Sequence, residues 1–193
     1  MITTKSDLKD YLKQDAIALR CGERKRPSLF GDEVWKFEIL LRKTEYYANR
    51  FRAGKKLYVF HYMWHRFRFH RLSVKLGFTV PLNVFGPGLS IAHYGTLVVN
   101  ANARVGKNCR IQEGVTIGTT NGSENAPQIG DNVFIGSGAK IIGDITVADD
   151  VAIGANAVVI KPITESGTTY GGVPARKISD RNSHANLVPE LFV

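Results

Sequence analysis

The sequence predicts a mainly β fold, a parallel β-helix of six-residue repeats that follows an α-helical region. Three observations lead to this fold class. A valine or isoleucine recurs every six residues between Val99 and Val159, with one interruption. A residue type that tolerates tight turns stands three positions after most members of this series. The residues before position 79 show helical spacing instead.

The β-branched series forms the expected core of the β-helix. Its members are Val99, Val105, Ile111, Ile117, Ile129, Ile135, Ile141, Val147, Ile153 and Val159. Branched side chains favour extended backbone, so each member marks a short strand with one side chain pointing inward. Three strands and three turns make one coil, and stacked coils bury the series as a continuous column.

A second series marks the turns. Three residues after the column stand Asn102, Asn108, Gly114, Asn132, Gly138, Asp144, Asp150 and Asn156, which are types that tolerate left-handed backbone. The positions that follow hold the apolar residues Ala103, Cys109, Val115, Val133, Ala139, Ile145, Val151 and Ala157. The interruption, residues 118–128, lacks a column residue and is rich in turn formers, which predicts a loop protruding from one corner.

The change of period divides the chain. Residues 1–78 are expected to form a basic helical region, because apolar residues recur there at helical spacing. The two series are Leu8, Tyr11, Leu12, Ala16 and Leu19, then Val34, Trp35, Ile39, Leu41, Tyr46 and Tyr47. Residues 79–178 form the expected β-helix domain with loop 118–128, and residues 179–193 form a C-terminal tail.

Positive charge is concentrated in the helical region. Residues 1–80 carry 18 Lys and Arg against 8 Asp and Glu, whereas residues 81–193 carry 8 against 9. Such asymmetry indicates either an anionic partner or a solvated helical surface. No motif of a known nucleic-acid-binding module accompanies the charge, so we expect no nucleic-acid partner.

The segment from Lys55 to Lys75 alternates basic and aromatic residues, and two interpretations stay open. It makes peripheral contact with the inner membrane face, or its aromatic rings pack against the rest of the protein or a partner subunit. The sequence has no apolar run long enough to span a bilayer and no secretory signal. Cys21 and Cys109 lack metal-ligand spacing. We therefore expect a cytoplasmic protein without a metal site.

Three stretches of the repeat domain carry a family resemblance. They are GLSIAHYGTLVVNANARVG, then EGVTIGTTNG with PQIGDNVFIGSGAKIIGDI, and finally VAIGANAVVIKPITESGTTYGGVPARKI. These residues resemble the hexapeptide acyltransferases, and within them the serine acetyltransferase branch. The closing GGVPAR is a signature of acetyl-CoA users in that superfamily. The part leading into FTVPLNVFGPGLSIAHYG also resembles a subgroup associated with exopolysaccharide and capsule synthesis.

The resemblance implies a left-handed β-helix that assembles into a homotrimer or a dimer of trimers. Acetyl-CoA would then lie in the groove between adjacent helices. The residues expected to contact acetyl-CoA are Gly118, Thr119, Ser137, Ala155, Lys161 and Arg176. Backbone groups of Ser137 and Ala155 would meet the pantetheine arm. The two residues that open the loop would lie near the thioester, and the two basic residues near the nucleotide phosphates.

His93 is the expected catalytic base. Acetyl transfer to an alcohol needs a base that removes the hydroxyl proton, and histidine titrates near neutral pH. His93 is the single histidine of the repeat domain, and its position matches the family's catalytic histidine. Judged from the residues alone, a hydrogen-bonded structural histidine is the alternative. Cys109 stands at a buried repeat position, so we expect direct attack in a ternary complex without an acetyl-cysteine.

Two departures from the serine acetyltransferases bear on the acceptor. Ala92 replaces the usual aspartate before the catalytic histidine, and Ala126 or its neighbours replace a histidine associated with holding serine. A site for a zwitterion needs charged partners, so we expect a saccharide hydroxyl as acceptor. Serine O-acetylation in cysteine biosynthesis is the alternative. The candidate acceptor contacts are Asn83, Tyr94, Asn100 and Glu113.

Two other functions have weaker support in the sequence. A carbonic anhydrase on the same kind of helix needs about three histidine or thiolate ligands for zinc, and the repeat domain has one histidine. A non-catalytic scaffold is the other rival, because a fold does not define a function. His93 together with GGVPAR favours an enzyme.

Overall fold

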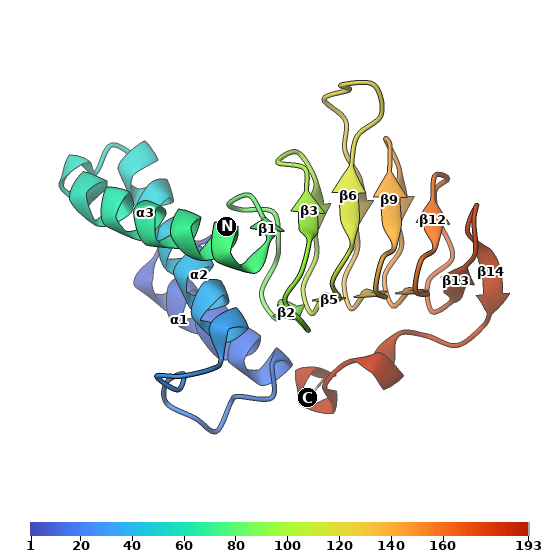
Figure 1. Ribbon diagram of the computed structural model, residues 1–193, viewed down its shortest axis with the longest axis horizontal. Coiled ribbons are helices and arrows are strands. Elements are labelled where there is room, and N and C mark those ends of the chain that lie inside the picture. The colour runs from blue at the N-terminus through green and yellow to red at the C-terminus, as the bar shows by residue number, and fades with distance from the viewer. Residues whose placement is uncertain (193) are drawn as a thin grey trace.

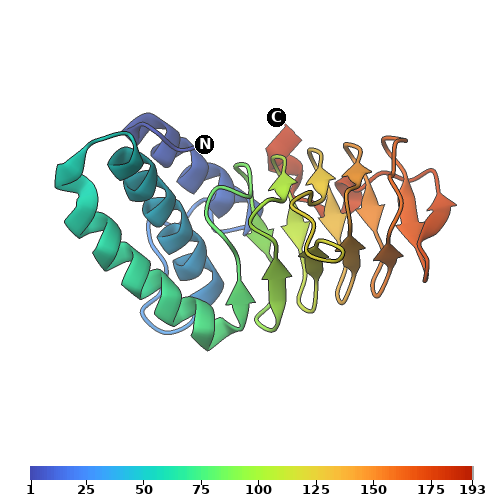
Figure 2. The ribbon, with the colours of Figure 1, turned by 90° about the horizontal axis from the view of Figure 1, so that it is seen from above.

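The computed structural model describes residues 1–192 and places a bundle of helices beside a three-sided β-helix (Figure 1). Helices α1 (Lys5–Ala18), α2 (Glu33–Arg52) and α3 (Val59–Leu76) form the bundle, and the short 3-10 helix η1 (Lys56–Tyr58) precedes α3. The coils of the β-helix continue from the end of α3 in a row along the long axis of the molecule (Figures 1 and 2). Val193, the last residue of the expected tail, lies outside the described residues.

Local sequence signals explain where α1 begins and where α3 ends. Thr4 and Asp7 form a capping box at the start of α1, in which the Asp7 N–H donates to Thr4 Oγ1 at 3.0 Å and the Thr4 N–H to Asp7 Oδ2 at 2.9 Å. Gly77 ends α3 with a φ of 78° and turns the chain into the first strand. The ring of Phe37 in α2 then packs against Phe69 of α3 and Phe78, which attaches the bundle to the coils.

Three sheets form the sides of the β-helix, and they are parallel except for one C-terminal hairpin. Sheet A contains β1 (Phe78–Thr79), β3 (Leu97–Val99), β6 (Thr116–Gly118), β9 (Lys140–Ile142) and β12 (Val158–Val159). Sheet B contains β4 (Arg104–Val105), β7 (Gln128–Ile129) and β10 (Thr146–Val147). Sheet C contains β2 (Ser90–Ile91), β5 (Arg110–Ile111), β8 (Phe134–Ile135), β11 (Ala152–Ile153), β13 (Thr169–Gly171) and β14 (Arg176–Ser179).

The core of the β-helix confirms the six-residue period. All ten members of the Val/Ile column are at most 5% exposed. Six of the eight turn residues adopt a left-handed φ between 55° and 74°, namely Asn108, Gly114, Asn132, Gly138, Asp150 and Asn156. Val99 pairs with Ile117, 18 positions later, whereas Ile117 pairs with Ile141, 24 positions later. The loop between β6 and β7 therefore adds six residues to its coil, and it projects from one corner (Figure 1).

The C-terminal segment runs back along the coils toward the bundle (Figure 1). It contains the short helices η2 (His184–Asn186) and η3 (Pro189–Phe192), and η3 contacts α1. The Ser183 N–H donates to the Asp150 carbonyl at 3.0 Å, and Leu187 and Val188 are buried. This segment therefore ties the middle coils to the first helix.

One face of η1 and α3 stays exposed. Leu57, Phe60, Met63, Trp64, Phe67 and Val74 are each at least 55% exposed. The aromatic residues of this stripe therefore do not pack against the rest of the described chain, so that packing against a partner subunit and contact with a membrane both stay predictions, whereas Phe69 on the other face is buried. Of the helices in the described part of the chain, none is both long and apolar enough to cross a membrane.

Candidate active site

The turns that link neighbouring sheets lie above one another and form the corners of the β-helix. Corner CA links sheet C to sheet A and consists of residues 92–96, 112–115, 136–139 and 154–157. Corner AB links sheet A to sheet B and consists of residues 100–103, 119–127, 143–145 and 160–162. Residues far apart in the sequence become neighbours within each corner, because successive coils stack in register.

His93 lies on corner CA, in the bend between β2 and β3, and is exposed. The bend is held by its backbone, since the Ala92 N–H donates to the Ile111 carbonyl at 3.0 Å and the Gly95 N–H to the Leu76 carbonyl at 3.2 Å. Gly95 has a φ of 130°, a conformation that favours glycine. The imidazole makes no hydrogen bond to any residue in the described range 1–192. This favours a histidine available to take a proton over a structural one.

Glu113 lies one coil below His93 on the same corner. A Cβ atom at Gly95 would lie 3.2 Å from the Glu113 Cβ, which shows how closely the two turns approach. The Ser137 hydroxyl donates to Glu113 Oε1, while Oε2 is buried without a partner among the described residues. The hydrogen bond from Ser137 and the nearby charge of His93 lower the pKa of Glu113. The carboxylate is therefore ionised at neutral pH beside His93, a relation that the sequence could not reveal.

Ser137 and Ala155 continue the same corner on the next two coils. The Ser137 N–H donates to Gln112 Oε1 at 3.0 Å, and the Ser137 backbone carbonyl accepts from the Asn156 N–H at 2.8 Å. Gln112 was not expected at the site, because nothing in its sequence position distinguishes it from other residues that follow the column. The four stacked turns of corner CA therefore carry His93, the expected base, at one end. They carry Ser137 and Ala155, the two expected pantetheine contacts, at the other end.

Corner AB gathers a second group of expected site residues. Asn100 begins its turn, where its Oδ1 accepts from the Asn102 N–H at 2.8 Å. The Gly118 carbonyl accepts from the Gly143 N–H at 3.0 Å, so the start of the loop is fixed on the next coil. Thr119 opens the loop, and Lys161 lies in the last turn of this corner and is exposed. The two corners therefore flank the outer face of sheet A.

Arg176 lies at the far end of the molecule, as the first residue of β14, and is exposed. Neither Lys161 nor Arg176 forms an ion pair with another residue in the described part of the chain. Lys177, by contrast, pairs with Glu165 and Asp180 at 2.5 Å. Neither cation is therefore neutralised by a carboxylate of the described residues, as the expected contact with phosphate groups requires.

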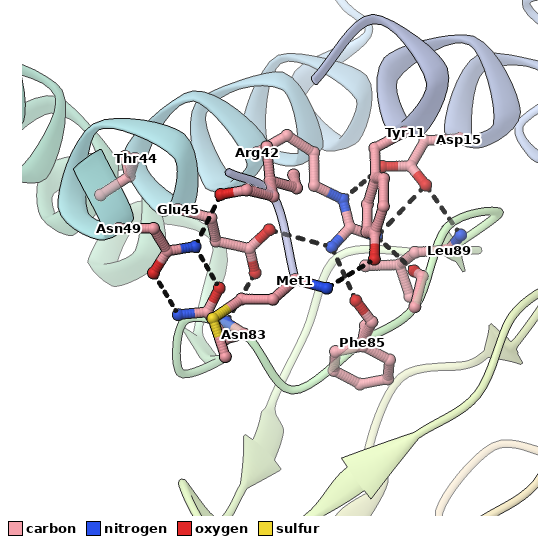
Figure 3. Close-up of polar contacts among 12 residues, drawn as sticks. Met1, Tyr11, Asp15, Arg42, Thr44, Glu45, Asn49, Asn83, Phe85 and Leu89 are labelled. Carbon is pink, nitrogen blue, oxygen red and sulfur yellow. Dashed lines mark hydrogen bonds and ion pairs between the residues drawn. The ribbon is translucent and has the colours of Figure 1, made fainter. Parts of the chain in front are cut away.

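The structure places two of the expected acceptor contacts, Tyr94 and Asn83, in different surroundings. Tyr94 follows His93 directly and is 62% exposed, so it lies at the site. Asn83 instead faces α2, where its side chain exchanges two hydrogen bonds with Asn49 at 2.9 and 3.0 Å (Figure 3). Its N–H donates to Glu45 at 2.7 Å. Because these bonds engage both ends of its amide, the structure gives Asn83 a role in joining the helices to the first coil and not in holding an acceptor.

The larger cavities of the described chain lie away from the corner that carries His93. Five cavities of about 240 to 710 Å³ are lined by the helices, the first coil and the C-terminal segment, and His93 lines none of these five. Within residues 1–192, no group of three or more His, Cys, Asp or Glu side chains is placed to hold a metal ion.

Comparison with protein families and curated proteins gives one consistent result. Residues 126–161 match the family described as bacterial transferase hexapeptide (six repeats). The chain is 32% identical over 158 residues to a serine acetyltransferase of Haemophilus influenzae and 33% identical over 165 residues to one of Escherichia coli K12. Each alignment covers 76% of this chain, but only 56% and 60% of the two relatives.

Comparison with solved structures also finds serine acetyltransferases. The serine acetyltransferase of Brucella abortus strain S19 superposes with a TM-score of 0.70 at 28% identity, covering 93% of this chain and 72% of that one. A serine acetyltransferase in complex with CoA also superposes with a TM-score of 0.70, at 26% identity, covering 90% of this chain and 71% of that one. The similarity therefore includes the helical region as well as the coils.

Proposed function

We propose that this chain, a hexapeptide-repeat transferase of the serine acetyltransferase branch, transfers the acetyl group of acetyl-CoA to a hydroxyl group. The observation that carries the proposal is corner CA, where His93, Glu113, Ser137 and Ala155 follow one another on successive coils. The relatives support a left-handed β-helix, and one of them is a complex with CoA, which supports acetyl-CoA as the co-substrate. The likeness to the capsule-associated subgroup stays a prediction.

His93 acts as general base in the proposed reaction. The acceptor oxygen attacks the carbonyl carbon of the thioester while its proton passes to the imidazole. A backbone N–H at Gly118 or Thr119 stabilises the oxyanion that forms. The C–S bond then breaks, and the leaving thiolate of CoA takes the proton back from His93. The Glu113 carboxylate lies one coil below His93 on the same corner, and its negative charge would stabilise the positive charge that develops on the imidazole as the proton is transferred.

The proposed active site is completed by a second copy of the chain in a homotrimer. His93 is exposed on a corner of the β-helix, whereas binding sites are concave and bury most of their ligand. The outer face of sheet A between the two corners carries Val98, which is 38% exposed, and β-strands of adjacent copies can cover such a surface. Acetyl-CoA would lie between two copies, with its phosphates near Lys161 and Arg176.

L-serine is the acceptor that the relatives support best. Several curated proteins of 32–33% identity are serine acetyltransferases, so the expectation of a saccharide acceptor has less support than its alternative. A saccharide hydroxyl remains the second candidate acceptor, because Ala92 and Ala126 offer no charged group to bind serine. Ala92 provides no charge beside His93, and Ala126 is 2% exposed and packs in the core, where it cannot contact an acceptor.

Thiol release from acetyl-CoA by the purified protein tests the proposal. We expect turnover with L-serine, and His93→Ala to lower kcat by at least about 100-fold, because general base catalysis contributes that much. His70→Gln on α3 is the matched control and keeps full activity. Turnover with a saccharide and none with serine would establish the second candidate. Full activity of His93→Ala would contradict the catalytic assignment.

The exposed stripe on α3 supports a further proposal, peripheral contact with an anionic membrane. The stripe is flanked by Arg66, Arg68, Arg71 and Lys75, and residues 55–76 contain no Asp or Glu. Aromatic and basic residues on one exposed helix favour the lipid interface. Co-sedimentation with vesicles containing phosphatidylglycerol tests this. Absence of binding at low salt would rule out the membrane contact.

A further inference from the structure

An open cavity of about 600 Å³ lies on the helical region, away from corner CA, and several of its lining residues are exposed to solvent. Its walls come from α1, α2, α3 and the connection between α1 and α2. It is as large as cavities that hold drug-sized ligands. The acetyl transfer proposed above uses none of its lining residues.

The cavity is lined by an excess of positive charge. Its basic residues are Lys13, Arg24, Lys25, Arg26, Lys36, Lys43 and Arg68. No Asp or Glu lines it in the described part of the chain. Arg24 pairs with Asp32 at 2.7 Å and Lys36 with Glu33 at 3.4 Å, but the other five cations have no ion-pair partner within residues 1–192. Uncompensated cations around one cavity favour an anionic occupant.

The same cavity has an apolar wall. Leu12, Ala16, Trp35, Ile39, Leu40 and Leu72 line it together with the cations. Trp35 and Leu40 are at most 8% exposed, so this wall belongs to the core of the bundle. A free inorganic anion would leave these apolar groups without a partner. The wall therefore favours a ligand with an apolar or aromatic part in addition to its negative charge.

The connection between α1 and α2, which forms one wall of the cavity, is held against α2 before any ligand binds. Two guanidinium nitrogens of Arg24 donate to the two oxygens of Asp32, at 2.7 and 3.1 Å, and the guanidinium lies 4.9 Å from the centre of the Trp35 ring. The Ser28 N–H also donates to Asp32 at 2.9 Å. Lys36 Nζ donates to the Leu29 carbonyl at 2.8 Å. The connection is thus folded against α2, which reduces the entropy lost on binding.

We propose that this cavity binds a phosphate or diphosphate ester whose remaining part is apolar or aromatic. Lys13, Lys43 and Arg68 approach from three different helices and bind the phosphate oxygens with charge-assisted hydrogen bonds. The body of the ester packs on Trp35, Leu40 and Leu72. The ester reaches the cavity either as a soluble molecule or as the headgroup end of a lipid, since both present the same chemistry.

His65 supplies an internal reporter of occupancy. It lines the cavity, and its ring packs 4.7 Å from that of Tyr47. Burial lowers the pKa of His65, and the neighbouring charges of Lys43 and Arg68 lower it further. An anion bound between these two cations offsets their effect. The pKa of His65, followed by NMR, should therefore rise when the cavity is filled.

Calorimetric titration of the full-length protein tests the proposal. We expect saturable binding of farnesyl diphosphate, with weaker binding of inorganic pyrophosphate and none of farnesol. Lys43→Gln combined with Arg68→Gln should weaken this binding by at least about tenfold, because two charge-assisted hydrogen bonds are lost. The control variant, Lys161→Gln with Arg176→Gln, removes the same charge from the proposed CoA site and should bind farnesyl diphosphate unchanged.

An assay of acetyl transfer distinguishes failure of this proposal from failure of the proposed function. Lys43→Gln with Arg68→Gln should retain wild-type transferase activity, so a loss of ester binding in an active enzyme supports a separate site. Displacement of farnesyl diphosphate by vesicles with phosphatidylglycerol identifies the lipid source, and no displacement identifies a soluble ester. The proposal is overturned by three results: no saturable binding to the wild type, equal affinity for pyrophosphate, or an equal loss in the control variant.

Discussion

Arg42 shows at the residue scale how the two halves of the molecule are joined. Its side chain is fully buried and donates to Asp15 at 2.7 and 3.2 Å, to Glu45 at 3.1 Å, and to the Phe85 and Gly86 carbonyls at 2.9 and 2.6 Å (Figure 3). Burial opposes its charge, but the two carboxylates outweigh burial and raise the pKa of Arg42. One side chain therefore connects α1, α2 and the first coil.

Arg42→Met should lower the free energy of unfolding by about 3–5 kcal/mol, because it leaves two buried carboxylates without their partner. Urea unfolding followed by circular dichroism measures the change. Arg24→Met removes an exposed ion pair and should lower the free energy of unfolding by less than about 1 kcal/mol. Equal effects of the two variants would show that the buried cluster does not hold the junction together.

The burial of Cys109 supports the direct-transfer mechanism. The thiol is 1% exposed, and burial raises its pKa to about 12, so it is protonated at neutral pH. We expect a thiol reagent to modify Cys21 in the folded protein and both cysteines in urea. Rapid modification of Cys109 in the folded protein, or an acetyl group found on it after reaction with acetyl-CoA, would contradict the mechanism.

At the scale of the elements, α2 supports the strand that leads to His93. Glu38 of α2 is fully buried, and its Oε1 accepts from the Ile91 N–H of β2 at 2.9 Å. Ile91 precedes His93 by two residues. Burial raises the pKa of Glu38 well above its usual value, and the nearby Asp15 raises it further. The helix therefore holds β2 through a carboxyl group whose raised pKa favours the protonated form.

Glu38→Gln should change how stability depends on pH. The wild-type carboxyl loses its proton more easily when unfolded, where its pKa is about 4.3, than when folded. Its contribution is therefore complete at acid pH and decreases as the pH rises from about 4.3 toward the raised folded pKa. The glutamine variant has no such group, so its urea midpoint relative to wild type should rise between pH 4.5 and pH 8. A constant difference, as expected for Glu124→Gln on the exposed loop, would contradict this.

At the scale of the whole molecule, assembly decides whether the proposed site is complete. Light scattering should give three times the chain mass, or six times if two trimers associate. Val98→Asp places a charge on the outer face of sheet A and should reduce both the trimer and the activity, while Val98→Thr should reduce neither. A fully active monomer would contradict a site shared between copies.

Local chemistry made the β-helix predictable. Each coil depends on a β-branched residue that enters the core and on a turn residue that accepts a left-handed φ, and both properties belong to single residues. Successive coils also repeat the same arrangement, so the pattern accumulates over the domain. His93 was identified from its place in that pattern and from the resemblance to a known family.

The remaining features required the folded chain. Glu113 and Ser137 are separated by 24 positions, yet they meet because stacking in register brings equivalent corners together. Asn83 resembles a corner residue in the sequence, but its pairing with Asn49 depends on how the bundle packs on the first coil.

The sequence by itself therefore determined the period and the core, because these depend on each residue's own conformational preferences, and its resemblance to a known family indicated His93 as the expected base. Only the tertiary structure decided which side chains share a corner, which buried charges join the helices to the coils, and where seven basic residues surround one cavity. These features arise from contacts between residues distant in the chain, and no single residue's preferences specify such contacts.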